Sequence, residues 1–152
     1  LLLDAFSPGK CPQLWSEEFI QSLAALLAPG GRLLTYCRAA AVRNSLRHAG
    51  LELRSLLPKP GDVAGWSSGT LAFRLNEYEQ YAPEIGPGWR GLSVMEEEHL
   101  QTRAGVPYRD PTGSDTAALI LKRRQHEQAF VELPSTSAWK RKWGLARQAC
   151  NF

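Results

Sequence analysis

The stretch Asp4-Ala5-Phe6-Ser7-Pro8-Gly9-Lys10-Cys11-Pro12-Gln13-Leu14-Trp15 decides how this chain folds. It follows an apolar run, Leu1-Leu2-Leu3, that is typical of the end of a buried strand. An Asp is rarely buried without a partner, and the two prolines of the stretch stop any helix or strand. Ligands of an open parallel sheet bind just beyond the carboxyl ends of its strands. Asp4 and Phe6 therefore lie where a ligand would bind, unless Asp4 only caps the turn through its own backbone.

The residues that follow alternate between predicted helices and predicted strands. Ser16 is a good N-cap, and the apolar spacing after it predicts a helix over residues 16–28. Pro29-Gly30-Gly31 ends that helix, and residues 32–37 form a continuous apolar strand. A second helix over residues 39–49 and strands over residues 51–56 and 68–75 complete the pattern. The order predicts an α/β fold whose last two strands form an antiparallel hairpin.

The second half of the chain predicts a linker followed by helices. Residues 76–91 are rich in proline and glycine and lack a regular apolar period. Ser93 and Glu96 form a capping box that opens a helix to about residue 103. We expect Ser114 or Asp115 to cap a long helix to about residue 131, and residues 135–136 to cap a last helix whose two tryptophans pack it onto the sheet. The predicted division is residues 1–75 and residues 76–152.

Composition narrows the class of protein. The 152 residues carry a net charge of +3, and residues 120–152 carry seven Lys or Arg against two Glu. Three cysteines without metal-site spacing predict a reduced, cytoplasmic protein without a metal. No apolar run approaches the length of a membrane span, and no secretory signal is visible. The chain also opens inside an apolar strand, without Met, so we expect a fragment that lacks an N-terminal half.

The deciding stretch, together with Pro29-Gly30-Gly31, Thr35-Tyr36 and Ala41-Val42-Arg43, resembles the methyltransferase module of the MnmC family. The resemblance covers about residues 1 to 57, and the stretch from Asp4 to Trp15 is its most specific part. Cys11 departs from the pattern, because the family usually has Asn there. The tail more loosely resembles the extension of cyanobacterial, stand-alone members. The resemblance implies the second half of a Rossmann-like class I methyltransferase sheet with a helical C-terminal extension.

The resemblance also implies the cofactor, the substrate and the residues that meet them. S-Adenosylmethionine is the implied cofactor, with Asp4 and Ala5 beside it. Neither a glycine-rich turn joining a strand to a helix nor the acidic strand end that holds the ribose occurs here, so the main cofactor site is expected in the missing half. Asp4 is the expected catalytic residue, because a carboxylate at this strand tip can accept a proton from an attacking amine. The expected substrate-binding residues are Phe6, Pro8, Lys10 and Tyr36.

Simpler roles stay open for several of these residues. Phe6 and Tyr36 can belong to the core, and Lys10 can be an ordinary solvated lysine. Trp15 is expected to wedge the helix start against the loop, and His48 and His99 are expected at the surface. The arginines of the helix over residues 39–49 are expected on a solvated face, together with the arginine just before it; they are Arg38, Arg43 and Arg47.

The implied function is transfer of a methyl group to the aminomethyl group of 5-aminomethyl-2-thiouridine at the wobble position of tRNA. The expected partner is tRNA, with no membrane, and no fused oxidase domain is visible in the sequence. Two alternatives remain: a methyltransferase for another amine, and a non-catalytic RNA-binding or interaction module built on the tail. An upstream glycine-rich turn with an acidic strand end would favour an enzyme.

Overall fold

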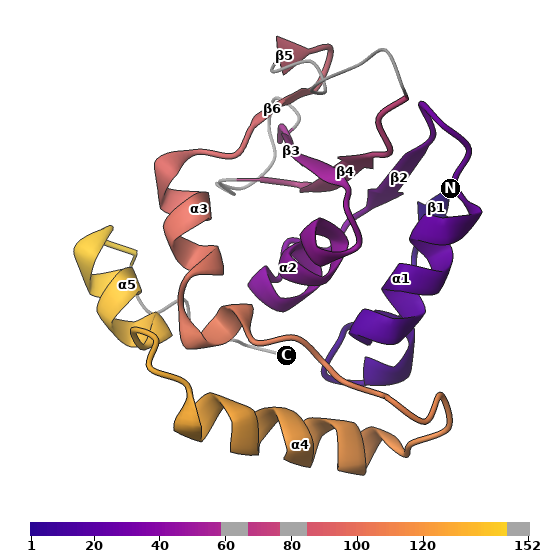
Figure 1. Cartoon of the computed structure of the whole chain (residues 1–152). Helices are drawn as coiled ribbons and strands as arrows, with labels where there is room; N and C mark the ends of the chain where they lie inside the picture. Colours follow the sequence, from indigo (N-terminus) through magenta and orange to yellow (C-terminus); the bar gives the residue numbers. More distant parts are fainter. Residues whose placement is uncertain (59–66, 77–84, 146–152) are drawn as a thin grey trace.

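The computed structural model describes residues 1–58, 67–76 and 85–145. Its centre is a six-stranded sheet in the order β1-β2-β4-β3-β6-β5 (Figure 1). The strands are β1 (Leu2–Leu3), β2 (Arg32–Thr35), β3 (Glu52–Leu56), β4 (Gly69–Phe73), β5 (Ile85–Gly86) and β6 (Trp89–Gly91). β1 and β2 are parallel, with Leu3 opposite Thr35, whereas the other neighbours are antiparallel. The predicted α/β fold and the antiparallel pairing of β3 with β4 are confirmed, but these are not the last two strands, because β5 and β6 follow them.

Two helices follow the predicted pattern closely. The helix α1 (Glu17–Leu26) begins after Ser16, whose side chain accepts a hydrogen bond from the backbone of Phe19 at 3.2 Å. A short 3-10 helix, η1 (Pro12–Trp15), precedes it. The helix α2 (Ala40–His48) ends before Gly50, whose φ of +79° suits the left-handed turn that glycine adopts easily. Figure 1 shows α2 lying between α1 and α3 (Val94–Leu100).

The apolar core lies between these helices and the sheet. α1 contributes Ile20, α2 contributes Val42 and Leu46, and β2 contributes Leu33, all of them buried. The same cluster contains Ile120, the buried residue of α4 (Ala117–Phe130). The helix α4 therefore shares the core formed by α1, α2 and β2, and burial of apolar surface drives that association.

The secondary structure of the C-terminal half differs from prediction in two respects. Residues 85–91 were expected in a linker but form β5 and β6, and β6 pairs with β3. Thr116, rather than Ser114 or Asp115, caps α4, because Asp115 is engaged by Arg123 at 2.8 Å. The capping box of Ser93 and Glu96 is confirmed, and the remaining elements are η2 (Arg103–Gly105) and α5 (Thr136–Lys142).

The two tryptophans of the last helix pack differently from prediction. The indole of Trp139 is buried against α3, not the sheet: it stacks on His99 with ring centroids 4.1 Å apart and donates to the backbone oxygen of Met95. Trp143 is partly exposed and donates to Glu98. α5 is therefore a second layer on α3. Arg147 and Cys150 lie outside the described residues.

Candidate active site

The carboxyl ends of the parallel strands meet at one edge of the sheet. Asp4 follows β1 directly, and Tyr36 follows β2 directly. Because β4 runs antiparallel to β2, with Thr70 opposite Thr35, the amino end of β4 reaches the same edge. The pairing of Leu56 with Gly69 brings the carboxyl end of β3 there too. This edge, which we call the carboxyl edge, is the location that the sequence predicts for ligand binding.

Asp4 lies exposed at the tip of β1. Among the described residues, its carboxylate makes no hydrogen bond and no ion pair. The alternative in which Asp4 caps the turn finds no support in these contacts, because the turn is closed by backbone hydrogen bonds from Lys10 and Cys11 to the oxygen of Ser7. The carboxylate is therefore available to a ligand.

The backbone beside Asp4 is held by two aromatic side chains. The hydroxyl of Tyr36 donates to the oxygen of Ala5 at 2.7 Å, and the indole nitrogen of Trp15 donates to the oxygen of Phe6 at 2.6 Å. The rings of Trp15 and Tyr36 meet edge to face, with centroids 6.2 Å apart. Trp15 is completely buried, as its predicted wedge role requires. Two consecutive carbonyl groups are thus fixed, while the side chains around them stay open to a ligand.

Tyr36 has a positioning contact in addition to its predicted place near the substrate. Its ring is 47% exposed, so the core alternative is wrong for this residue. Partial burial, Cys37 and the charge of Asp4 raise the pKa of the Tyr36 phenol. The phenol keeps its proton over a wider pH range and remains a donor to Ala5.

The remaining predicted substrate residues line the loop after Asp4. Phe6 is 78% exposed, so its core alternative is wrong, and the ring is a free stacking surface. Pro8 is half-buried and Lys10 is exposed. Lys10 makes no ion pair among the described residues. Ala5, which the resemblance places beside the cofactor, is half-buried and contributes its carbonyl to Tyr36. The structure brings all six predicted site residues to the carboxyl edge; their roles stay predictions.

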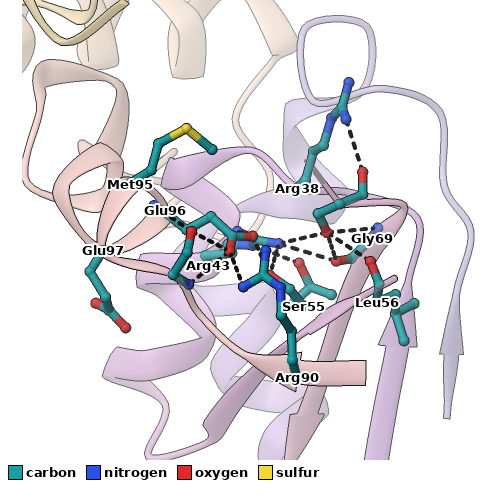
Figure 2. A network of polar contacts seen from close by, with 12 residues as sticks. Arg38, Arg43, Ser55, Leu56, Gly69, Arg90, Met95, Glu96 and Glu97 are labelled. Carbon is teal, nitrogen blue, oxygen red and sulfur yellow. Dashed lines mark hydrogen bonds and ion pairs between the residues drawn. The ribbon is translucent and has the colours of Figure 1, made fainter. Parts of the chain in front are cut away.

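One functional candidate was not predicted from the sequence. Arg43 was expected on a solvated face, but its side chain is only 1% exposed. Figure 2 shows it at the centre of a polar network. Its guanidinium donates to Glu96, to the hydroxyls of Thr70, Ser55 and Ser67, and to the oxygen of Gly69, over 2.9–3.2 Å. A buried arginine with this many acceptors is fully engaged.

Glu96 receives donors on both carboxylate oxygens. Oε1 accepts from Arg43 and Ser55, and Oε2 accepts from Arg90 at 2.8 Å and from the backbone and hydroxyl of Ser93 at 2.9 Å. Burial raises the pKa of Glu96, but the hydrogen bonds from Ser55 and Ser93 and the charge of Arg43 outweigh it, so the pKa lies below its usual value. Glu96 is therefore charged at neutral pH. No sequence signal links it to Arg43, 53 residues earlier.

His99 of α3, which was expected at the surface, is half-buried. Burial of the His99 ring, together with the charges of Arg43 and Lys140, lowers its pKa to about 4. His48 is exposed as expected, and its Nδ1 lies 2.6 Å from Glu17. Arg38 and Arg47 are exposed; Arg47 forms a bidentate pair with Glu97.

Within the described residues, no group of His, Cys, Asp and Glu has the geometry of a metal site. The described helices also include none that is long and apolar enough to cross a membrane. Lys140 and Arg141 are exposed on α5, whereas Lys142 is paired with Glu98 at 2.7 Å.

Comparison with known proteins identifies the first part of the chain. Residues 1–61 match the sequence model of a family described as S-adenosyl-L-methionine-dependent methyltransferase. A "tRNA 5-methylaminomethyl-2-thiouridine biosynthesis bifunctional protein MnmC" from Ralstonia nicotianae is 37% identical over 87 residues, which are 57% of this chain and 13% of that protein. The protein of the same name from Pseudomonas savastanoi is 26% identical over 155 residues, covering 86% of this chain and 24% of that protein. The chain thus spans less than a quarter of the length of these relatives.

The fold is shared with a solved structure. "Crystal structure of MNMC2 from Aquifex Aeolicus" superposes with a TM-score of 0.65 at 21% identity, over 86% of this chain and 39% of that one. At this identity the likeness establishes the fold. It includes the C-terminal half, which the family match does not reach. Residues 1–61 thus match the family of S-adenosyl-L-methionine-dependent methyltransferases, and the chain is similar to MnmC proteins over 57–86% of its length.

Proposed function

We propose that this chain forms the substrate-side half of a cytoplasmic enzyme that methylates the aminomethyl group of 5-aminomethyl-2-thiouridine at the tRNA wobble position. The observation that carries the proposal is Asp4: an exposed carboxylate without a partner among the described residues, at the tip of β1, inside the family-matched segment. The names of the MnmC relatives support the choice of tRNA and of an aminomethyl uridine.

The proposed cofactor position is at the carboxyl edge, beside β1. Cofactors of open α/β sheets lie across the carboxyl ends of the strands. β1 is the edge strand of the described sheet, and Asp4 and Ala5 follow it. Asp4 and the backbone of Ala5 would therefore border the reactive end of S-adenosylmethionine. When bound, this cofactor supplies an electrophilic methyl group.

The proposed role of Asp4 is to bind and deprotonate the substrate amine. An aliphatic amine is protonated at neutral pH, and only its free base has the lone pair that attacks a methyl group. The carboxylate of Asp4 would attract the ammonium form, orient its nitrogen and accept a proton from it, which frees the lone pair to attack the methyl group while the cofactor sulfur keeps the electron pair of the broken S–C bond. The exposed position of Asp4 leaves space for this amine. The hydrogen bonds to the carbonyls of Ala5 and Phe6 hold the backbone that follows Asp4.

The residues after Asp4 suit a flipped nucleotide. A base taken out of its stack is held by aromatic faces, and Phe6 is the exposed aromatic of this loop. Lys10 provides a cation for a nearby phosphate, and Pro8 shapes the loop between them. This set favours a nucleic-acid amine over a free small molecule, because a small amine needs neither the stacking face nor the phosphate contact.

The test is methyl transfer by the protein in its natural full length. The substrate is a tRNA that bears 5-aminomethyl-2-thiouridine, and the matched control is the same tRNA with 2-thiouridine. We expect transfer from labelled S-adenosylmethionine to the first tRNA alone. Transfer to small amines at a similar kcat/KM would replace tRNA with another amine substrate. RNA binding without any transfer would favour the non-catalytic module.

A further inference from the structure

A buried network ties the C-terminal half of the chain to the carboxyl edge. Glu96, on α3, is fully buried and binds Arg43 of α2 at 3.0 Å. Arg43 in turn donates through Nε to the hydroxyl of Thr70, the second residue of β4, at 2.9 Å. Thr70 donates to the backbone oxygen of Cys37 at 2.7 Å. The four groups form one continuous series of hydrogen bonds from α3 to the residue after Tyr36.

The start of β4 also contacts Tyr36 directly. A Cβ added at Gly69 would lie 2.4 Å from the oxygen of Thr35 and 3.0 Å from the Cα of Tyr36, so only a residue without a side chain allows this approach. The backbone oxygen of Ser67 accepts from Arg38 at 2.9 Å, and the Ser67 hydroxyl accepts from Arg43. The residues on both sides of Cys37 are therefore held by the segment that Arg43 organises.

We propose that Glu96, Arg43 and Thr70 are positioning residues that hold Tyr36, and through its bond to Ala5 the Asp4 loop, in the geometry that methyl transfer requires. The inference rests on the proposed function of Asp4. It adds a role for the C-terminal half, which the sequence suggested only as a separate extension. None of the three residues is placed in contact with substrate.

The burial of the ion pair supports a positioning role over a purely stabilising one. Removing two charges from water is costly, and a well-packed apolar pair often stabilises a fold equally well. Arg43 also donates hydrogen bonds to five acceptors on three separate segments of the chain. A hydrophobic side chain could not hold these segments in the same way, because it donates no hydrogen bonds. The network specifies where these segments lie, which suits a site where small displacements are costly.

The test compares two substitutions of Thr70 that separate shape from hydrogen bonding. Thr70→Val keeps the shape and loses the bond to Cys37, whereas Thr70→Ser keeps the hydroxyl and loses a methyl group. In the natural full-length protein we expect Thr70→Val to lower kcat by about tenfold or more, with KM for S-adenosylmethionine within about twofold, and Thr70→Ser to retain kcat within about threefold. A Val variant with normal kcat, or a Ser variant as impaired as Val, would overturn the proposal.

A second measurement does not depend on methylation. Hydrogen–deuterium exchange of the 152-residue chain should be at least about tenfold faster at residues 36–38 in Thr70→Val than in Thr70→Ser, with α1 unchanged as the internal reference. If Thr70→Val does not fold, Ser67→Ala removes another acceptor of Arg43 and should accelerate the same amides. Unchanged exchange would refute the positioning role. An inactive wild-type protein would refute the proposed function and leave this exchange result standing.

Discussion

Replacing Glu96 with Gln is expected to destabilise the chain far more than the same change one residue later. Both oxygens of Glu96 accept a bond from a guanidinium, Oε1 from Arg43 and Oε2 from Arg90. A Gln amide therefore points its NH₂ group at a cation in either orientation. It also leaves the charge of Arg43 buried without its carboxylate. Breaking a buried pair in this way costs about 3–5 kcal/mol.

Glu97→Gln is the matched control. Glu97 lies on the same helix and pairs with Arg47 of the same partner helix, with N–O distances of 2.8 and 2.9 Å. The two side chains of this pair are 45% and 40% exposed, so the pair contributes only about 0.5 kcal/mol. Urea unfolding of the 152-residue chain, followed by circular dichroism at pH 7, measures both variants. Equal losses in the two variants would refute the energetic account of the network.

The pH dependence of Glu96→Gln follows from the lowered pKa of Glu96 in the folded chain. A carboxyl whose pKa is lower in the folded than in the unfolded state stabilises the fold above its unfolded pKa. That stabilisation is lost as the pH falls through the folded pKa. The free energy of unfolding of the wild type should therefore approach that of Glu96→Gln below about pH 4. A constant difference from pH 7 to pH 3 would contradict the assignment.

Three further predictions concern separate parts of the chain. Tyr36→Phe removes the donor to Ala5, and we expect less than about 1 kcal/mol loss of stability but about a tenfold lower kcat; a change in substrate KM alone would instead assign the phenol to binding. Burial lowers the pKa of His99 to about 4. The free energy of unfolding should therefore fall by on the order of 2 kcal/mol as the pH drops from 6.5 to 4, and His99→Phe should remove this pH dependence. An unaltered pH dependence in His99→Phe would contradict the prediction. If α5 contacts the tRNA backbone, Lys140→Gln with Arg141→Gln should reduce the salt dependence of tRNA binding by about one to two phosphate contacts. Lys122→Gln, an exposed control on α4, should leave the salt dependence unchanged. The same salt dependence in the double variant and the wild type would mean that Lys140 and Arg141 do not contact tRNA.

The sequence predicted the elements that depend on contacts between residues close together in the chain. The N-cap at Ser16, the glycine after α2 and the capping box of Ser93 and Glu96 each involve residues within a few positions of one another. The carboxyl edge was also predictable, because strand order and strand polarity bring Asp4 and Tyr36 to the same side. The loop from Asp4 to Trp15 carried a specific motif as well.

Long-range partners could not be predicted. Arg43 looks like one of several arginines on a polar helix face until Glu96, Thr70 and Ser55 close around it. His99 is solitary in sequence, and its ring is half-buried in the structure, where Trp139 of α5 stacks on it. The strand β6 is short and contains glycine, so its intrinsic propensity for a strand is weak. Its pairing with β3 outweighs that weak propensity. In each case a tertiary contact outweighed the local preference.

Single-turnover methylation by Asp4→Asn tests most directly whether Asp4 accepts the proton of the amine. In the natural full-length protein, Asn keeps the size of Asp4 and removes the charge and the proton acceptor. We expect the methyl-transfer rate on tRNA with 5-aminomethyl-2-thiouridine to fall by about two to four orders of magnitude, while affinity for S-adenosylmethionine changes little. A rate within a few-fold of wild type would remove Asp4 from the chemistry.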